Sequence, residues 1–219
     1  MMDAGESPSP TKDKIEQTVF VVEDDLAVGQ SLVDLFESSG LASVHYASAE
    51  EFLANWSQKM AGCLLLDVRL PGISGIELQA RLAERGFEIP IVVMTAHGDI
   101  PMVRKALKAG AVEFLTKPFH NEELFESIGE AFAQDLATRQ KRSFSEALLE
   151  RVATLSERER QVLELVTTGL TNREIADRIH LSVVTVKLYR RLGMQKMQAN
   201  SLAELVKMWD KLEPDSNPR

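Results

Sequence analysis

Four groups of polar residues in the first half of the chain are of types that could carry out phosphoryl transfer. Each follows a short apolar run directly or after one threonine: Glu23 with Asp24 and Asp25, then Asp67, Thr95 and Lys117. Carboxylates held close together raise one another's pKa, and a hard divalent cation with oxygen ligands, typically Mg²⁺, can neutralise them. If these residues meet, Mg²⁺ and the ammonium can stabilise phosphoryl oxygens, one carboxylate can act as nucleophile, and the hydroxyl can sense the product.

The apolar runs that precede these residues predict the strands of a parallel sheet. They are residues 18–22, 42–46, 63–66, 91–94 and 112–115. Helix-length stretches separate them, so each connection must return the chain to the same end of the sheet, with helices on both faces. Ligands of such sheets bind at the carboxyl ends of the strands. The expected fold class is therefore α/β, a doubly wound five-stranded parallel sheet, with the polar groups at one edge.

The second half of the chain predicts an all-α domain of four helices, over residues 157–167, 172–179, 183–197 and 202–209. Thr171 and Ser182 are of the type that caps a helix N-terminus. Between the two halves, residues 122–149 have a helical pattern that becomes polar from Ala133 onward. Residues 133–153 are therefore expected to be either a continuous helix or a hinge.

Charge is divided unequally between the two halves. Residues 1–138 carry 10 Lys and Arg against 22 Asp and Glu, a net charge of −12, whereas residues 139–219 carry 15 against 11, a net charge of +4. A mildly basic half with its cations on a few helices could contact nucleic acid. No apolar run approaches the ~20 residues that span a bilayer. The N-terminal residues 1–17 have no apolar segment and are expected to be a flexible tail, and Cys63 a buried thiol in a reducing cytoplasm.

The motifs VVEDD, LLLDVRLPGISG, VVMTAHGD and EFLTKPF, in this order and spacing, resemble those of the receiver domain family. The resemblance extends over residues 18–137 and implies a flavodoxin-like sheet with strand order 2-1-3-4-5. It implies that Asp67 is phosphorylated, and that Mg²⁺ is bound by Glu23, Asp24, Asp67 and the backbone carbonyl of Arg69. Thr95 is then the switch hydroxyl, Lys117 the cation that pairs with the phosphate, and Phe114 the aromatic that turns inward with Thr95. The resemblance also implies a cis peptide at Lys117-Pro118.

Several residues near these motifs have a second interpretation. Asp25 matches a position that is often acidic but outside the metal's ligands, where it can shape the loop. Phe114 can equally be a core aromatic. His45 and His97 do not match positions that carry chemistry in the family, and both are interpreted as structural.

Residues 155–206 resemble the LuxR-type helix-turn-helix. Within 183–197, Val183, Val186 and Leu192 can anchor one face of a helix, while another face, predicted to enter the DNA major groove, presents Lys187, Leu188 and Arg191. By resemblance, the residues that grip DNA phosphates are Arg173, Thr185, Arg190 and Lys196. The plain alternative for these cations is a solvated helix surface.

Three features of this segment either differ from the family pattern or have two possible roles. Gly193 replaces a large aliphatic residue, which could loosen or bend the recognition helix, since glycine in a helix costs ~1 kcal/mol relative to alanine. Tyr189 lies where the family often has histidine, and could pack or contact phosphate. Leu202, Leu205, Val206 and Trp209 could pair two domains on DNA or pack in the core.

Together the two resemblances identify the chain as a member of the NarL/FixJ type of two-component response regulators. The expected domains are a tail at 1–17, the receiver at 18–137, a helical linker at 138–153, the DNA-binding domain at 154–211 and a tail at 212–219. The type implies a cytoplasmic DNA-binding regulator whose cofactor is Mg²⁺. Its expected partners are a sensor histidine kinase, promoter DNA and, on activation, a second copy of the chain. It is not expected to be an enzyme beyond its own phosphorylation and dephosphorylation.

Two other functions are compatible with parts of this pattern. An aspartate-nucleophile phosphatase of the haloacid dehalogenase type is also doubly wound, but it would place Asp-x-Asp after its first strand, where this chain has Glu23, Asp24 and Asp25. A regulator that uses the receiver only as a dimer scaffold would bind DNA without phosphorylation.

Overall fold

A computed structural model describes residues 17–96 and 100–212, except for the side chains of residues 100–103. The expected tails, apart from Gln17 and Leu212, and His97 lie outside the described residues. The chain divides between Thr138 and Arg139 into two compact units. Each unit is described below by itself.

The first unit is built on a five-stranded parallel sheet with strand order β2-β1-β3-β4-β5, which confirms the predicted order. Its strands are β1 (Thr18–Val22), β2 (Ala42–Tyr46), β3 (Gly62–Asp67), β4 (Ile91–Thr95) and β5 (Glu113–Thr116). β3 and β4 are longer than the apolar runs predicted, because backbone pairing continues into the polar residues Asp67 and Thr95. These two side chains therefore lie on the sheet itself.

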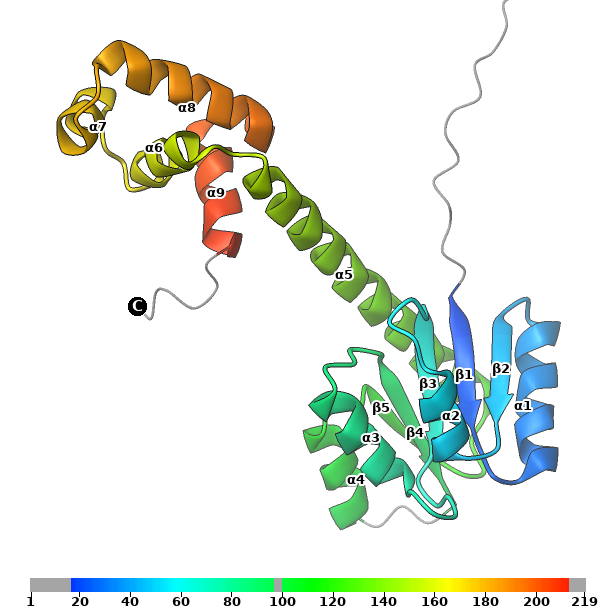
Figure 1. Ribbon diagram of the computed structural model, residues 1–219. Helices are drawn as coiled ribbons and strands as arrows, with labels where there is room; N and C mark the ends of the chain where they lie inside the picture. Colours follow the sequence, from blue (N-terminus) through cyan, green and yellow to red (C-terminus); the bar gives the residue numbers. More distant parts are fainter. Residues whose placement is uncertain (1–16, 97–99, 213–219) are drawn as a thin grey trace, which may run out of the picture. The chain divides into compact units, whose positions relative to one another are not determined.

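Helices cover both faces of this sheet (Figure 1). They are α1 (Leu26–Ser38), α2 (Ala49–Asn55), α3 (Gly75–Glu84), α4 (Ile100–Lys108) and α5 (Asn121–Ala153). One face packs against α1 and α5 and the other against α2, α3 and α4, as the two hydrophobic clusters show. Successive residues of β3, Leu64 and Leu65, belong to opposite clusters, which explains the unbroken apolar run. Cys63 is buried, as predicted, and burial raises its pKa.

Helix α2 was not predicted from apolar spacing, because it has only seven residues and two buried positions, Ala49 and Phe52. Its signal in the sequence is a cap: the Ser48 side chain accepts a hydrogen bond from the backbone N–H of Glu51. The helix completes the wall of aromatic rings in which Phe52 lies between Tyr46 and Trp56.

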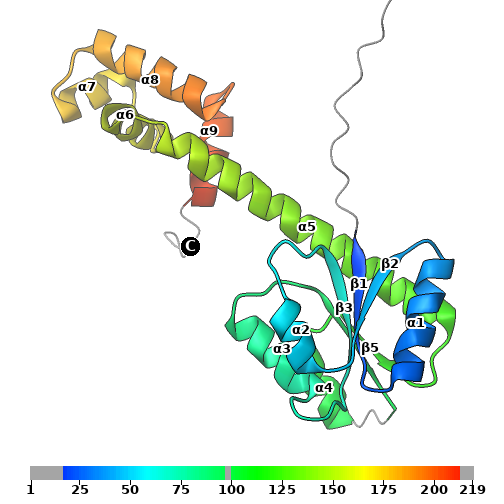
Figure 2. The same cartoon turned by 45° about the vertical axis from the view of Figure 1, so that its right-hand side comes forward.

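The second unit is all-α, with α6 (Glu157–Thr167), α7 (Asn172–Ile179), α8 (Val183–Met197) and α9 (Leu202–Leu212) (Figure 2). Thr171 and Ser182 cap α7 and α8 as predicted. The expected linker, residues 138–153, forms the C-terminal part of α5 and is a continuous helix. Its Leu148 is buried in the core of the second unit and Val152 packs against that core. This segment therefore contributes apolar contacts to the second unit in addition to connecting the two.

Asp135 joins α5 to the start of β3 and β1 and provides a test of this packing. The side chain is 4% exposed, and its Oδ2 accepts hydrogen bonds from the backbone N–H of Gly62 at 2.9 Å and from Gln17 Nε2 at 3.4 Å. We predict that Asp135→Ala lowers the free energy of unfolding of the first unit by about 1–3 kcal/mol, because the buried N–H of Gly62 loses its acceptor. Urea unfolding followed by circular dichroism measures this, with Glu130→Ala, exposed on the same helix, as the control. Equal stability of the two variants would contradict the prediction.

Candidate functional site

The carboxyl ends of β1, β3 and β5 bring two carboxylates and one ammonium together. Lys117 Nζ lies 2.5 Å from Glu23 Oε2 and 2.6 Å from Asp67 Oδ2. Glu23 is 3% exposed and Asp67 7%, so both carboxylates are largely removed from water. The arrangement carries one more negative charge than positive, and it unites three of the residues that sequence motifs predicted.

Thr95 lies at the end of β4, between β3 and β5, and is fully buried. Its carbonyl accepts a hydrogen bond from the backbone N–H of Lys117 at 2.8 Å, which joins the ends of β4 and β5. The Lys117-Pro118 peptide is cis, as the family resemblance predicted. Phe114 on β5 is partly buried against the core on the face of α2, α3 and α4. In this conformation it is a core aromatic.

The electrostatics of Glu23 and Lys117 follow from their burial and contacts. Burial raises the pKa of Glu23 above its ordinary value, and the nearby charge of Asp67 adds to this, while the hydrogen bond from Lys117 opposes it. Burial alone would lower the pKa of Lys117, but the hydrogen bonds and charges of Asp67 and Glu23 outweigh it and raise that pKa. The ammonium is thus held in its charged form, and the second carboxylate charge is only partly compensated.

Asp24 and Arg69 are exposed beside this buried group and line the same hollow. The other residues that line it are Val68, Leu70, Pro71, Ser74, Ile76 and, on α4, Lys105. The backbone N–H of Arg69 donates to Asp67 Oδ1 at 2.9 Å, which orients that carboxylate. Within residues 17–96 and 100–212, no three or more His, Cys, Asp or Glu side chains are arranged to hold a metal ion. The available donors are nonetheless carboxylate and carbonyl oxygens in an excess of negative charge, which is the chemistry that Mg²⁺ prefers.

Asp25 shapes the loop after β1, as one interpretation of the sequence proposed. Its Oδ1 accepts hydrogen bonds from the backbone N–H groups of Ala27 at 2.9 Å and Val28 at 3.2 Å, and so caps α1. A carboxylate at a helix N-terminus is also favoured by the helix dipole. Asp25 is therefore committed to the helix, and Asp24 is the exposed carboxylate of the loop.

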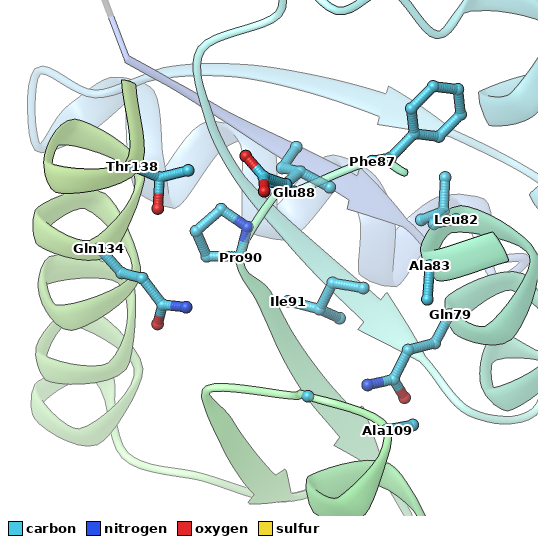
Figure 3. A pocket seen from close by; sticks show the side chains of 12 residues that line it. Gln79, Leu82, Ala83, Phe87, Glu88, Pro90, Ile91, Ala109, Gln134 and Thr138 are labelled. Atoms are coloured by element: carbon cyan, nitrogen blue, oxygen red, sulfur yellow. The ribbon is translucent and has the colours of Figure 1, made fainter. Parts of the chain in front are cut away.

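A second hollow lies at the opposite, amino end of β4 and has a different character (Figure 3). Pro90 and Ile91 line it, together with Gln134 and Thr138 on α5, and Glu88 is its one ionisable lining residue. Gln79 forms part of its wall and donates from Nε2 to the carbonyl of Ala106 at 3.0 Å, which ties α3 to α4. With one carboxylate and no cation among its described lining residues, this hollow lacks the groups that phosphoryl transfer needs.

Helix α8 presents the predicted DNA-facing residues on an exposed surface. Lys187, Leu188 and Arg191 are all exposed, Leu188 at 44%. Of the three predicted anchors on its other face, Val186 is fully buried and Leu192 half-buried. Val183 is instead 38% exposed, so its prediction as an anchor was wrong. The reason is its place in the first turn, where the helix extends beyond the core.

The predicted phosphate-gripping residues differ in how free they are to contact a ligand. Arg173 is exposed. The hydroxyl of Thr185 lies 2.7 Å from that of Ser182, and Arg190 donates to Asn172 Oδ1 at 3.1 Å. Lys196 is paired within the protein: its Nζ lies 2.6 Å from Glu159 Oε2 and 3.1 Å from the carbonyl of Thr154. Sequence reasoning missed this use of Lys196, because Glu159 is 37 residues away in the chain.

The structure also decides three open features of this unit. Helix α8 continues through Gly193, which is buried, and a Cβ there would lie 2.8 Å from Leu163 Cδ1. The glycine thus permits close contact between α6 and α8. Tyr189 packs against the core, as do the buried Leu205 and Trp209 of α9, whereas Leu202 is 40% exposed.

Comparison with known families matches both units. The response regulator receiver domain matches residues 19–129, and the family of bacterial regulatory proteins called luxR matches residues 153–209. None of the helices in the described part of the chain is long and apolar enough to cross a bilayer.

Individual proteins are similar over almost the whole chain. Nodulation protein W of Bradyrhizobium diazoefficiens is 44% identical over 94% of this chain and 91% of its own length. Transcriptional regulatory protein FixJ of Azorhizobium caulinodans is 43% identical over 87% of this chain and 90% of its own. The solved structure of the response regulator StyR, 43% identical, covers 90% of this chain and 99% of its own with a TM-score of 0.82. Full-length FixJ from B. japonicum, 38% identical, covers 92% and 99% with a TM-score of 0.54.

The pair of Lys196 and Glu159 predicts a pH-dependent stability of the second unit. Burial opposes ionisation of Glu159, but hydrogen bonds from Lys196 and Ser156 outweigh it, so the pKa lies below its ordinary 4.5. Because the pKa of Glu159 is lower in the folded state, the stabilisation from this ion pair is fully present above pH 4.5. It is lost as the pH falls through the pKa of the folded state. We predict that Glu159→Gln costs about 1–2 kcal/mol at neutral pH and progressively less in acid.

Urea unfolding followed by the fluorescence of Trp209, in a Trp56→Phe background, measures this. Trp209 belongs to the same core as Leu163 and Val166, so its signal reports on the second unit. Arg160→Gln, which removes an exposed partner of Glu164 on the same helix, is the matched control. A cost of Glu159→Gln that stays constant from neutral pH to about pH 3 would be inconsistent with the lowered pKa.

Proposed function

The chain belongs to the response regulators that join a receiver domain to a LuxR-type DNA-binding domain, and we propose that Asp67 is the residue whose phosphorylation controls it. It is a transcriptional regulator, with a kinase and DNA as partners. The observation that carries the proposal is the contact of Asp67 with Lys117 at 2.6 Å, beside a hollow open to solvent. A regulator of this kind acts on DNA in the cytoplasm.

The proposed reaction uses Asp67 as the nucleophile. A carboxylate oxygen attacks the phosphorus of a phosphohistidine on the sensor kinase, the P–N bond breaks, and the phosphoryl group stays on Asp67 as an acyl phosphate. Lys117 supplies a positive charge at the phosphoryl oxygens, and the N–H of Arg69 keeps the carboxylate oriented. The protein's own catalysis is limited to its phosphorylation and its dephosphorylation, in which water hydrolyses the acyl phosphate and regenerates the Asp67 carboxylate.

Mg²⁺ is the proposed cofactor of this site. Glu23, Asp24, Asp67 and the backbone carbonyl of Arg69 would hold it, and it would neutralise charge on the phosphoryl oxygens. The contact of one Lys117 ammonium with two buried carboxylates supports this assignment, because the second carboxylate charge is only partly compensated. Glu23 also forms an ion pair with Lys117.

The proposed switch begins at Thr95. Thr95 is buried at the end of β4, the strand between β3 and β5, which supports a role for its hydroxyl as the sensor of a phosphoryl group on Asp67. Movement of Thr95 toward the phosphate would let Phe114 turn inward and change the surface around α4 and β5. That change favours pairing of two copies, which then read two DNA half-sites.

The DNA contacts proposed are those of α8. Lys187 and Arg191 reach guanine edges in the major groove, and Leu188 meets a thymine methyl. Arg173, Thr185 and Arg190 contact phosphates, while Lys196 must leave Glu159 before it can do so. Family membership leaves no support for the phosphatase alternative, and the phosphorylation-independent regulator is tested by the first experiment below.

We predict that Asp67→Asn abolishes phosphorylation by acetyl phosphate with Mg²⁺, because the amide is not a nucleophile comparable to carboxylate. Intact-mass spectrometry detects the phosphoryl group, and binding of the treated protein to promoter DNA detects its effect. Asp34 is exposed on α1, and Asp34→Asn is the control. It is expected to keep both the phosphorylation and its effect on DNA binding. Full phosphorylation of Asp67→Asn would refute the assignment, and DNA affinity that is equal with and without phosphorylation would favour the scaffold function.

We also predict different effects for two arginines of the second unit. Arg191→Ala weakens binding to promoter fragments selected by the phosphorylated full chain by about tenfold or more and relaxes base preference. Arg173→Ala weakens binding to all DNA sequences alike, and it reduces the magnitude of the slope of log affinity against log salt concentration by about 1. Gel-shift titrations at several salt concentrations measure both, with Lys207→Ala, exposed on α9, as the control. If Arg191→Ala leaves base preference unchanged, α8 does not read bases through this residue.

A further inference from the structure

The loop that carries Glu23 and Asp24 is held by a side chain that the reaction above does not use. His45 on β2 places its Nε2 2.7 Å from the carbonyl oxygen of Glu23. The backbone N–H of Glu23 donates to the carbonyl of Tyr46 at 3.1 Å. Strand β2 therefore binds both polar groups of the Glu23 backbone, one with its backbone and the other with the imidazole.

The imidazole of His45 is itself confined by helix α1. A Cβ on Gly29 would lie 2.3 Å from His45 Nε2 and 2.6 Å from both Cδ2 and Cε1, so the ring lies against the bare backbone of this glycine. Gly29 is in the first half of α1, where glycine costs ~1 kcal/mol relative to alanine. The contact with His45 gives this residue a specific purpose, because no larger side chain leaves room for the ring.

The other end of the loop is held independently. Asp25 caps α1 through its side chain, and its carbonyl accepts a hydrogen bond from the N–H of Gly29 at 2.8 Å. Asp24 thus lies between a residue bound by His45 and a residue bound to α1. The direction of the exposed Asp24 carboxylate depends on both attachments.

We propose that His45 is a positioning residue, which orients the loop of Glu23 and Asp24 for binding of Mg²⁺ through its hydrogen bond to the Glu23 carbonyl. The inference rests on the proposed function of this site. Nε2 carries a proton in one neutral tautomer and in the imidazolium, so the bond to the carbonyl is available in both protonation states. Groups that orient metal ligands typically affect metal affinity by about 10–100-fold.

The test compares three variants of the full chain. His45→Leu removes the Nε2 donor and puts an apolar side chain of similar reach in its place. His45→Gln restores an N–H at about the distance of Nε2. Val44→Ala changes the adjacent position of β2, whose side chain is 42% exposed and points to the other face of the sheet, and is the matched control.

The first measurement is calorimetric titration with Mg²⁺ alone. We expect the Kd for Mg²⁺ to rise about tenfold or more in His45→Leu, to return to within a few-fold of the original in His45→Gln, and to stay unchanged in Val44→Ala. Urea unfolding monitors whether each variant is folded. An unchanged Kd in His45→Leu overturns the inference, and so does an equal loss in His45→Leu and His45→Gln.

The second measurement uses the metal-free protein and separates this inference from the proposed function. In ¹⁵N spectra, the amide signals of Asp24 and Asp25 should shift in His45→Leu and return toward their original positions in His45→Gln. Signals that do not move overturn the role of His45. If the unaltered chain fails to bind Mg²⁺, the proposed metal site is wrong, and these amide shifts still decide whether His45 holds the loop.

Discussion

The ammonium of Lys117 lies between the buried carboxylates of Glu23 and Asp67, and the architecture of the first unit serves this contact. Glu23 and Lys117 follow β1 and β5, Asp67 is the last residue of β3, and β4 lies between β3 and β5 in the sheet. The long lysine side chain must pass the end of β4 to reach its partners, which is where Thr95 is buried. A parallel sheet places all these ends at one edge, and a shift in strand register would separate charges that burial makes costly to leave unpaired.

Helix packing on both faces is what keeps this edge in place. The strands alternate their side chains between two apolar clusters, so neither face can slip without exposing a core. The loop after β1 is held in addition by polar contacts from β2 and α1, through His45 and Asp25. This support fixes the positions of the carboxylates at the edge of the sheet.

The charged side chains of α8 in the second unit are of two kinds, those paired within the protein and those exposed to solvent. Lys196 and Arg190 have partners in neighbouring helices, Glu159 and Asn172, and help to set the position of α8. Lys187 and Arg191 have their exposed positions on the same helix, where a ligand can reach them. Close contact at Gly193 brings α8 against Leu163 of α6, so this helix is firmly attached to the core of the second unit.

The amino-acid sequence by itself determined the order and extent of most elements, because apolar periodicity, capping residues and strand-end motifs are local signals. The bounds of α6, α7 and α8 followed from them, whereas the pairing order of the sheet came from the resemblance to the receiver family. Only the tertiary structure decided which side chains meet across the chain: His45 with Glu23, Lys196 with Glu159, and Gly193 with Leu163. These contacts join residues 22 to 37 positions apart and depend on how helices and strands pack, which no local pattern encodes.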